Sequence, residues 1–182
     1  MTYTAKTFNL PVLEGISEKQ IKVHLALYEG YVKQVNLIME TLLGYAAYGD
    51  KATEGDKLAI AELRRHFAFE FDGMRMHELY FAQMEAGSRK LEAGSALANA
   101  VKEKYGGKGL EAHIREVAST RGIGWVVVYK DTIAGTLHIT FVADHEVGQL
   151  AGLPIVFALD LWEHAYMVDY MPVDKKNYID AF

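Results

Sequence analysis

The sequence contains no cysteine among its 182 residues. This absence excludes disulfides, thiolate metal sites and cysteine nucleophiles, and it is typical of a protein in a reducing compartment. The sequence also lacks a run of about 18 apolar residues, the length that a membrane-spanning helix requires. The first ten residues contain one lysine and no apolar stretch that would form a signal peptide. We therefore expect a soluble, cytoplasmic protein that does not contact membranes.

Positive charge is not in excess. The chain has 19 lysines and arginines against 24 aspartates and glutamates, which gives a formal net charge of -5. Nucleic-acid binding requires a basic face, and the basic residues here are scattered, so we expect no nucleic-acid partner. The chain is, in contrast, rich in apolar residues. Hydrophobic residues make up 51% and aromatic residues 12% of it, enough for a full core in one compact unit or in two small layers.

Helical spacing of apolar residues dominates the first half of the chain. The first predicted helix covers residues 17–43 and opens with Ser17-Glu-Lys-Gln20, which has the Ser-x-x-Gln form of a capping box. A second helix is predicted over residues 54–84. Two shorter helices follow at 95–105 and 110–119, and glycines close both of them.

The period then changes from helical spacing to two. Residues 125–129 and 136–142 are rich in β-formers and are separated by a turn-like stretch at 130–135, so they predict a hairpin. Residues 154–160 predict a third strand, and residues 162–170 a short helix.

These elements predict an α+β fold. A long α-helical hairpin at the N-terminus would be followed by a mixed α/β domain with a small antiparallel three-stranded sheet. The sequence is loosened by glycine and serine between residues 85 and 94. We therefore expect two domains, an α-hairpin domain at 1–86 and an α/β domain at 91–182.

Histidines are the residues most able to carry chemistry here, and there are seven: His24, His66, His77, His113, His138, His145 and His164. For any single histidine, the commonest explanation is a surface position or a satisfied place in the core. His66 and His113 lie in charged helical contexts, so we assign them no role. His138 alternates with apolar neighbours in a predicted strand and is expected to face away from the core.

His24 and His77 differ because each lies on the apolar face of a long helix. His24 shares its stripe with Leu27, Tyr28, Tyr31 and Val35, and His77 shares its stripe with Phe67, Met74, Phe81 and Met84. Antiparallel packing of the two helices would place two neutral nitrogen ligands in a dry seam. The alternative is two buried histidines that bond to the backbone.

A second pair of candidate ligands lies near the C-terminus, in Asp160-Leu-Trp-Glu-His-Ala-Tyr166. Together with the two helical histidines, Asp160 and His164 would form a site of three imidazoles and one carboxylate. Such a set without sulfur suits iron or manganese, and by ligand type it could also hold zinc.

This stretch closely resembles the C-terminal signature of the iron/manganese superoxide dismutase family, D-x-W-E-H-A-Y-Y, and departs from it only at Met167. The segment ending at His24 is similar to the family's I-S-x-x-T-I-x-x-H, and the segment beginning at Tyr31 to its Y-V-x-x-L-N. Gly122-Ile-Gly-Trp125 resembles its F-G-S-G-W turn into the sheet. The resemblance implies that the metal ligands are His24, His77, Asp160 and His164.

The resemblance also implies an activity. It is the disproportionation of superoxide to dioxygen and hydrogen peroxide by one iron or manganese ion per subunit, which cycles between its trivalent and divalent states; we favour iron slightly. Superoxide would be the substrate, and the protein a homodimer or homotetramer. One alternative is a metal-binding structural or interaction protein on the same fold. A zinc-type hydrolase is a weaker alternative, because no spare acid stands at a spacing that identifies a general base.

Further roles come from the resemblance. Tyr31 corresponds to the gateway tyrosine that shapes access and relays protons; its alternative is an aromatic core residue. Trp125 and Trp162 correspond to walls of the pocket, which ordinary core packing would also explain. Glu163 corresponds to the acid that reaches across the dimer to the ligand histidine of the other subunit, and its alternative is a solvated glutamate.

Several positions depart from the family pattern. The family places a glutamine that binds the metal's solvent molecule on the second helix or the hairpin, and some members have histidine at the hairpin position. The candidate here is His145, or Asp144 or Glu146 if the loop register differs. We expect Gly73, four residues before His77, to make room for His145. Other departures are Ala158, at a position associated with metal preference, and Arg75, which is either a surface residue or one that guides the anion.

One further departure concerns the length of the first helix. His24 and Tyr31 are seven residues apart, one fewer than in the family. We therefore expect plain α-helix where the family has a π-bulge.

Overall fold

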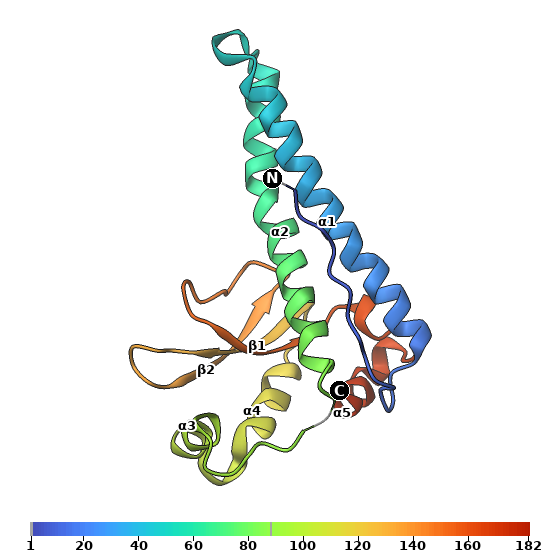
Figure 1. Cartoon of the computed structure of the whole chain (residues 1–182), viewed down its shortest axis with the longest axis vertical. Coiled ribbons are helices and arrows are strands. Elements are labelled where there is room, and N and C mark those ends of the chain that lie inside the picture. Colours follow the sequence, from blue (N-terminus) through green and yellow to red (C-terminus); the bar gives the residue numbers. More distant parts are fainter. Residues whose placement is uncertain (1, 88) are drawn as a thin grey trace.

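The computed structural model describes residues 2–87 and 89–182. Two long antiparallel helices, α1 (Glu18–Ala46) and α2 (Glu54–Met84), form a hairpin that extends well beyond the rest of the molecule (Figure 1). Residues 2–13 run in extended form along this hairpin. Two short helices follow, α3 (Ala96–Tyr105) and α4 (Gly109–Ala118), and lie beside the sheet.

Both long helices begin at residues that satisfy their free N–H groups. Ser17 caps α1 by accepting a hydrogen bond from the backbone N–H of Gln20 (3.0 Å), and Thr53 forms a complete capping box with Asp56 at the start of α2. The box predicted at Ser17 is only half formed, because the Gln20 side chain does not return to the cap. Helix α1 is α-helical along its whole length, so the expectation of no π-bulge before Tyr31 is confirmed.

Three antiparallel strands form the sheet: β1 (Gly124–Lys130), β2 (Leu137–Ala143) and β3 (Ile155–Asp160), in the order β2-β1-β3. β3 is therefore an edge strand, and α2 covers its edge. Ala158 in β3 donates its N–H to the Gln83 Oε1 atom of α2 (3.2 Å), and the Gln83 amide donates back to the Ala158 carbonyl. The pairing places Asp160 directly opposite Trp125.

The core lies on both faces of this sheet, and β1 separates its two clusters by side-chain alternation. Trp125 and Val127 pack toward the helical hairpin, in one cluster that includes Val35, Met74 and Phe81. Val126 and Val128 point to the other face and pack in a second cluster with helix α4. The predicted fold class is therefore confirmed: a helical hairpin followed by an α/β part with a three-stranded antiparallel sheet. The division into domains at 1–86 and 91–182 stays a prediction.

The C-terminal segment differs from the prediction. Residues 162–170 do not form the expected helix, because only a 3-10 turn (Glu163–Ala165) is present and irregular turns follow. Turn hydrogen bonds link part of this backbone, and three of its groups bond to side chains: the N–H of Trp162 donates to Asp160 Oδ1 (2.9 Å), and Gln20 binds the carbonyl of His164 and the N–H of Val168. A short helix that the sequence did not predict, α5 (Lys175–Ala181), ends the chain.

Helices α1 and α2 are long enough to cross a bilayer but not apolar enough. No helix within the described residues meets both requirements.

Candidate metal centre

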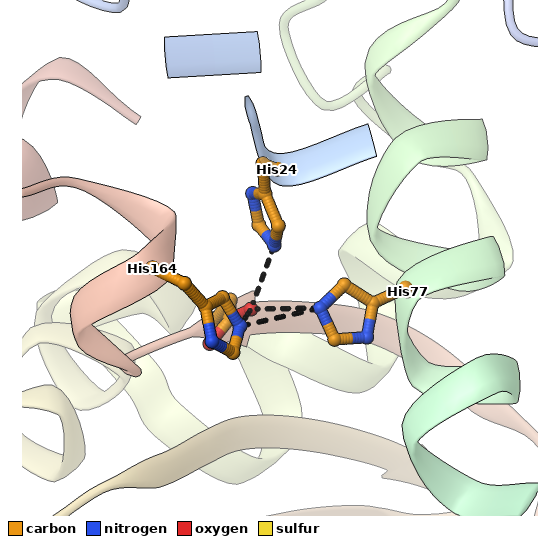
Figure 2. A group of neighbouring side chains, drawn as sticks. His24, His77 and His164 are labelled. Atoms are coloured by element: carbon orange, nitrogen blue, oxygen red, sulfur yellow. Dashed lines mark hydrogen bonds and ion pairs between the residues drawn. The ribbon is translucent and has the colours of Figure 1, made fainter. Parts of the chain in front are cut away.

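Four side chains from four different elements meet between the helical hairpin and the C-terminal part of the chain. His24 comes from α1, His77 from α2, Asp160 from the end of β3 and His164 from the 3-10 turn. One nitrogen or oxygen atom of each lies within 4.8 Å of the others. Figure 2 shows the three imidazole rings pointing toward one another. Three of the four residues are buried, and His164 is partly exposed.

The carboxylate lies at the centre of the group. Asp160 Oδ2 is 3.1 Å from the Nε2 atoms of both His24 and His164, and 3.5 Å from Nε2 of His77. The two Nε2 atoms of His77 and His164 are 3.3 Å apart. Lone pairs that face one another at these distances repel unless a proton or a cation lies among them. A cation at the centre would satisfy all four groups at once.

Hydrogen bonds around the group fix two of the donors. His77 Nδ1 lies 2.6 Å from the Gly73 carbonyl, which only accepts, so Nδ1 carries the proton and Nε2 keeps its lone pair toward the centre. Asp160 Oδ1 accepts from the backbone N–H of Trp162, which leaves Oδ2 for the centre. For His24, Nδ1 is buried and has no hydrogen-bond partner among the described residues.

The charges suit a bound cation. Burial lowers the pKa of His24, and lowers that of His77 well below its ordinary value, so both rings are neutral near pH 7. Burial alone would raise the pKa of Asp160, but His164 and His24 together hold it well below its usual range. A buried carboxylate is thus ionised beside the two neutral imidazoles of His24 and His77. Three nitrogens and one oxygen with no sulfur match the ligands that iron and manganese accept.

A second hydrogen-bonded group adjoins the four residues. His145 is buried in the loop after β2, between Trp125 and Tyr31. The indole Nε1–H of Trp125 donates to His145 Nδ1 (2.9 Å). Because an indole can only donate, Nδ1 is the unprotonated nitrogen and Nε2 carries the proton. Nε2–H therefore donates to the Tyr31 hydroxyl oxygen at 2.7 Å.

The ionisation of this group agrees with that assignment. Burial lowers the pKa of His145 to about 4 and raises the pKa of Tyr31. His145 is consequently neutral and Tyr31 keeps its proton near pH 7. Since the Tyr31 oxygen already accepts from His145, its own O–H is free to donate to another group.

Gly73 serves a neighbour other than the one predicted. A Cβ atom at this position would lie 2.7 Å from Cδ1 of the Tyr31 ring. The prediction that the glycine makes room for His145 is therefore wrong: it makes room for Tyr31. The sequence could not indicate this, because the contact joins α2 to a side chain of α1.

Aromatic rings enclose the two groups. Trp162 stacks on the rings of His145 and His164, with centroids 4.9 and 5.5 Å apart, and Trp125 meets His77 edge-on at 5.1 Å. Phe69 adds a further ring 4.8 Å from His145. Such walls keep water away from the group and strengthen the interactions inside it.

Two charged residues lie away from this enclosure. Glu163, next to a candidate ligand, is exposed. Arg75 forms an ion pair with Glu78 (2.7 Å) and lies over the ring of Tyr3, on the side of the hairpin where the N-terminal segment runs.

Gln20 is a site residue that the sequence reasoning missed. Its side chain binds the backbone of His164 and Val168, whereas the capping pattern had assigned it to the start of α1. No local signal distinguishes the two roles, because the partners are more than 140 residues apart.

A helical hairpin and a small antiparallel sheet bring three histidines and one aspartate together in a candidate mononuclear metal site without sulfur ligands. A sequence model described as "Iron/manganese superoxide dismutases, C-terminal domain" matches residues 93–182. The chain is 34% identical over 172 residues to the iron superoxide dismutase of Aquifex aeolicus, an alignment that covers 93% of this chain and 79% of the relative. It belongs to the iron/manganese superoxide dismutase family, as its motifs predicted.

Other relatives carry the name of either metal. The iron superoxide dismutase of Saccharolobus solfataricus is 30% identical over 175 residues, with 92% of this chain and 79% of the relative covered. Manganese superoxide dismutase 1 of Halobacterium salinarum is 30% identical over 159 residues, with 87% and 76% covered. The relatives therefore indicate one iron or manganese ion as the cofactor without choosing between the two.

Proposed function

We propose that this protein is a superoxide dismutase that holds one iron or manganese ion through His24, His77, Asp160 and His164. Two superoxide anions and two protons would give one dioxygen and one hydrogen peroxide. The observation that carries the proposal is the convergence of three imidazole nitrogens on one buried carboxylate oxygen. When bound, the metal would supply the one-electron redox chemistry of the reaction.

The four residues prepare the site for an anionic substrate. Asp160 contributes the one negative charge of the group, and the neutral rings of His24 and His77 contribute none, so the site compensates only part of a bound cation's charge. The remaining positive charge favours superoxide over neutral molecules. Long-range attraction is not expected from a chain with a net charge of -5, so the attraction is local.

Tyr31 is proposed as the proton donor at the edge of the site. The raised pKa keeps the proton on its hydroxyl, and the hydrogen bond from His145 directs that proton away from the imidazole. In this proposal Trp125 keeps His145 in the donating tautomer, and Trp125 and Trp162 exclude water.

We also propose a homodimer in which Glu163 reaches the partner subunit's His164. Glu163 is exposed and adjoins the one candidate ligand that is not fully buried, which supports an interface at this position. Light scattering would test it: the chain should have twice its monomer mass, and Glu163→Ala should reduce that mass. A monomeric wild-type chain would refute it.

The absence of cysteine supports a cytoplasmic location.

A metal-binding protein without dismutase activity is the second candidate. It is favoured by the departures from the family pattern around the site, which include Ala158 and Met167. Under this second candidate function, the chain would bind the metal as tightly as a dismutase but would not remove superoxide.

Two matched histidine variants test the first proposal. His77→Ala should abolish stoichiometric metal binding and superoxide removal. His66→Ala, on the same helix but bonded to Glu70 on a half-exposed face, should change neither. Equal activity of the two variants would refute the ligand assignment. Full metal binding by wild-type protein with no superoxide removal would leave the second candidate.

A further inference from the structure

The loop that carries His164 has little regular structure of its own beyond a 3-10 turn. Backbone hydrogen bonds within the loop form its turns, and side chains at the start of α1 attach the loop to the helical hairpin. Gln20, only 1% exposed, donates its side-chain Nε2–H to the carbonyl of His164 (2.7 Å). Its Oε1 atom accepts the backbone N–H of Val168 (2.9 Å). One buried amide thus binds both sides of the turn.

A second residue of α1 extends this attachment. Ser17, the cap of α1, donates its N–H and its hydroxyl to the two carboxylate oxygens of Asp169, at 2.7 and 2.6 Å. Four hydrogen bonds therefore join the start of α1 to the loop between residues 164 and 169. Those of Ser17 are exposed, whereas those of Gln20 are shielded from water, where a hydrogen bond is stronger.

Gln20 lies one helical turn before His24 on the same face of α1. The same face therefore supplies one candidate ligand directly and holds the backbone of another. The carbonyl that Gln20 binds belongs to His164 itself, so a shift of this amide moves that ligand relative to His24.

This chain differs from the family's motif at this position. The motif quoted above, I-S-x-x-T-I-x-x-H, has threonine where the chain has Gln20. A hydroxyl can also donate and accept, but the threonine side chain is shorter by two bonds and does not extend as far from α1 toward His164 and Val168 as the amide does.

We propose that Gln20 is a positioning residue for the metal ligand His164. Its two hydrogen bonds hold the ligand loop against α1 and keep the His164 ring in place for the metal. This inference rests on the proposed ligand set but not on dismutase activity. It predicts that Gln20 controls how firmly the metal is retained and how symmetrically it is bound, beyond any general effect on stability.

The test compares wild-type protein with Gln20→Leu, which has a similar volume but no polar group, and Gln20→Thr, which introduces the residue of the motif. The control is Gln34→Leu, an exposed glutamine on the same helix. Each protein is loaded with iron and diluted into excess EDTA, and the rate of iron release is followed. The electron paramagnetic resonance spectrum of the ferric form reports the symmetry of the site.

We expect Gln20→Leu to release iron about tenfold faster or more, the lower bound usual for loss of a group that orients a metal ligand. The ferric spectrum should change in both Gln20 variants, and in neither respect should Gln34→Leu differ from wild type. In the metal-free proteins, hydrogen exchange of the Val168 amide should accelerate only in the Gln20 variants.

Two results would overturn the proposal. One is a Gln20→Leu or Gln20→Thr protein that unfolds at lower temperature but keeps the wild-type release rate and spectrum, because Gln20 would then only stabilise the fold. The other is an equal change in Gln34→Leu. If wild-type protein binds iron without removing superoxide, the proposed dismutase activity is refuted, and the rates of iron release still decide the Gln20 proposal. If it binds neither iron nor manganese, the ligand set fails and the proposal with it.

Discussion

The hydrogen bond between Trp125 and His145 gives the sharpest prediction for the chemistry. Trp125→Phe removes the indole N–H but keeps an aromatic ring in the pocket. His145 Nδ1 then becomes a buried acceptor without a donor, which costs about 1–3 kcal/mol. Moving the ring proton from Nε2 to Nδ1 no longer breaks a hydrogen bond. By the same energy, the ratio of the two tautomers should shift by roughly 5- to 150-fold toward Nδ1–H.

The altered tautomer changes what Tyr31 can do. With Nε2 unprotonated, His145 accepts the Tyr31 proton across the 2.7 Å contact instead of donating to the oxygen. That proton is no longer available to the site, so superoxide removal per bound metal should fall. Nitrogen-15 chemical shifts of His145 in the metal-free protein report the tautomer directly. Unchanged shifts together with unchanged activity in Trp125→Phe would refute the reasoning.

Three further perturbations have defined outcomes. Acid should destabilise the metal-free protein between pH 6.5 and about 4, because the pKa of His145 is about 4 in the folded protein and the unfolded chain binds this proton at higher pH. In denaturant titrations, His145→Gln should remove up to about 3 kcal/mol of that loss of stability. A variant with the pH profile of wild type would contradict the assignment. Gly73→Ala should displace the Tyr31 ring and lower turnover several-fold, while stability changes by only about 1–2 kcal/mol, because the cost of overpacking is partly offset by the higher helix propensity of alanine. Turnover equal to that of wild type would show that the Tyr31 ring can move without loss of activity. Burial alone would raise the pKa of Glu78, but ion pairs with Lys6 and Arg75 lower it, so the stability that these pairs contribute should be present above pH 4.5 and lost as pH falls through the lowered pKa. Glu78→Gln should be less stable than wild type at pH 7 and lose less stability on acidification. Parallel curves of stability against pH for the two proteins would argue against the pairs.

The parts of the fold that the sequence predicted are those governed by local pattern. The stripe through His24, Tyr28 and Val35 marks the buried face of α1 because a helix repeats every 3.6 residues. Residues 125–129 are all β-formers, and they are buried on both faces of β1 because side chains alternate along a strand. Leu27 was placed on the buried stripe but is 36% exposed, since it lies at the edge of that face.

The parts that the sequence could not predict depend on contacts between distant residues. Residues 162–170 contain good helix formers, yet the carbonyl of His164 and the N–H of Val168 bond to Gln20, which is 144 residues before His164. The space left by Gly73 is filled by Tyr31 from the facing helix. The convergence of Asp160 with the helical histidines likewise follows from the pairing of β3 with β1, which no residue near Asp160 encodes alone.

Superoxide removal by the purified protein, reconstituted separately with iron and with manganese and normalised to bound metal, tests the central claim most directly. We predict one metal per chain and rapid removal by at least one form, with iron slightly favoured. Stoichiometric metal binding with no removal by either form would contradict dismutase activity, and failure to bind either metal would contradict the site itself.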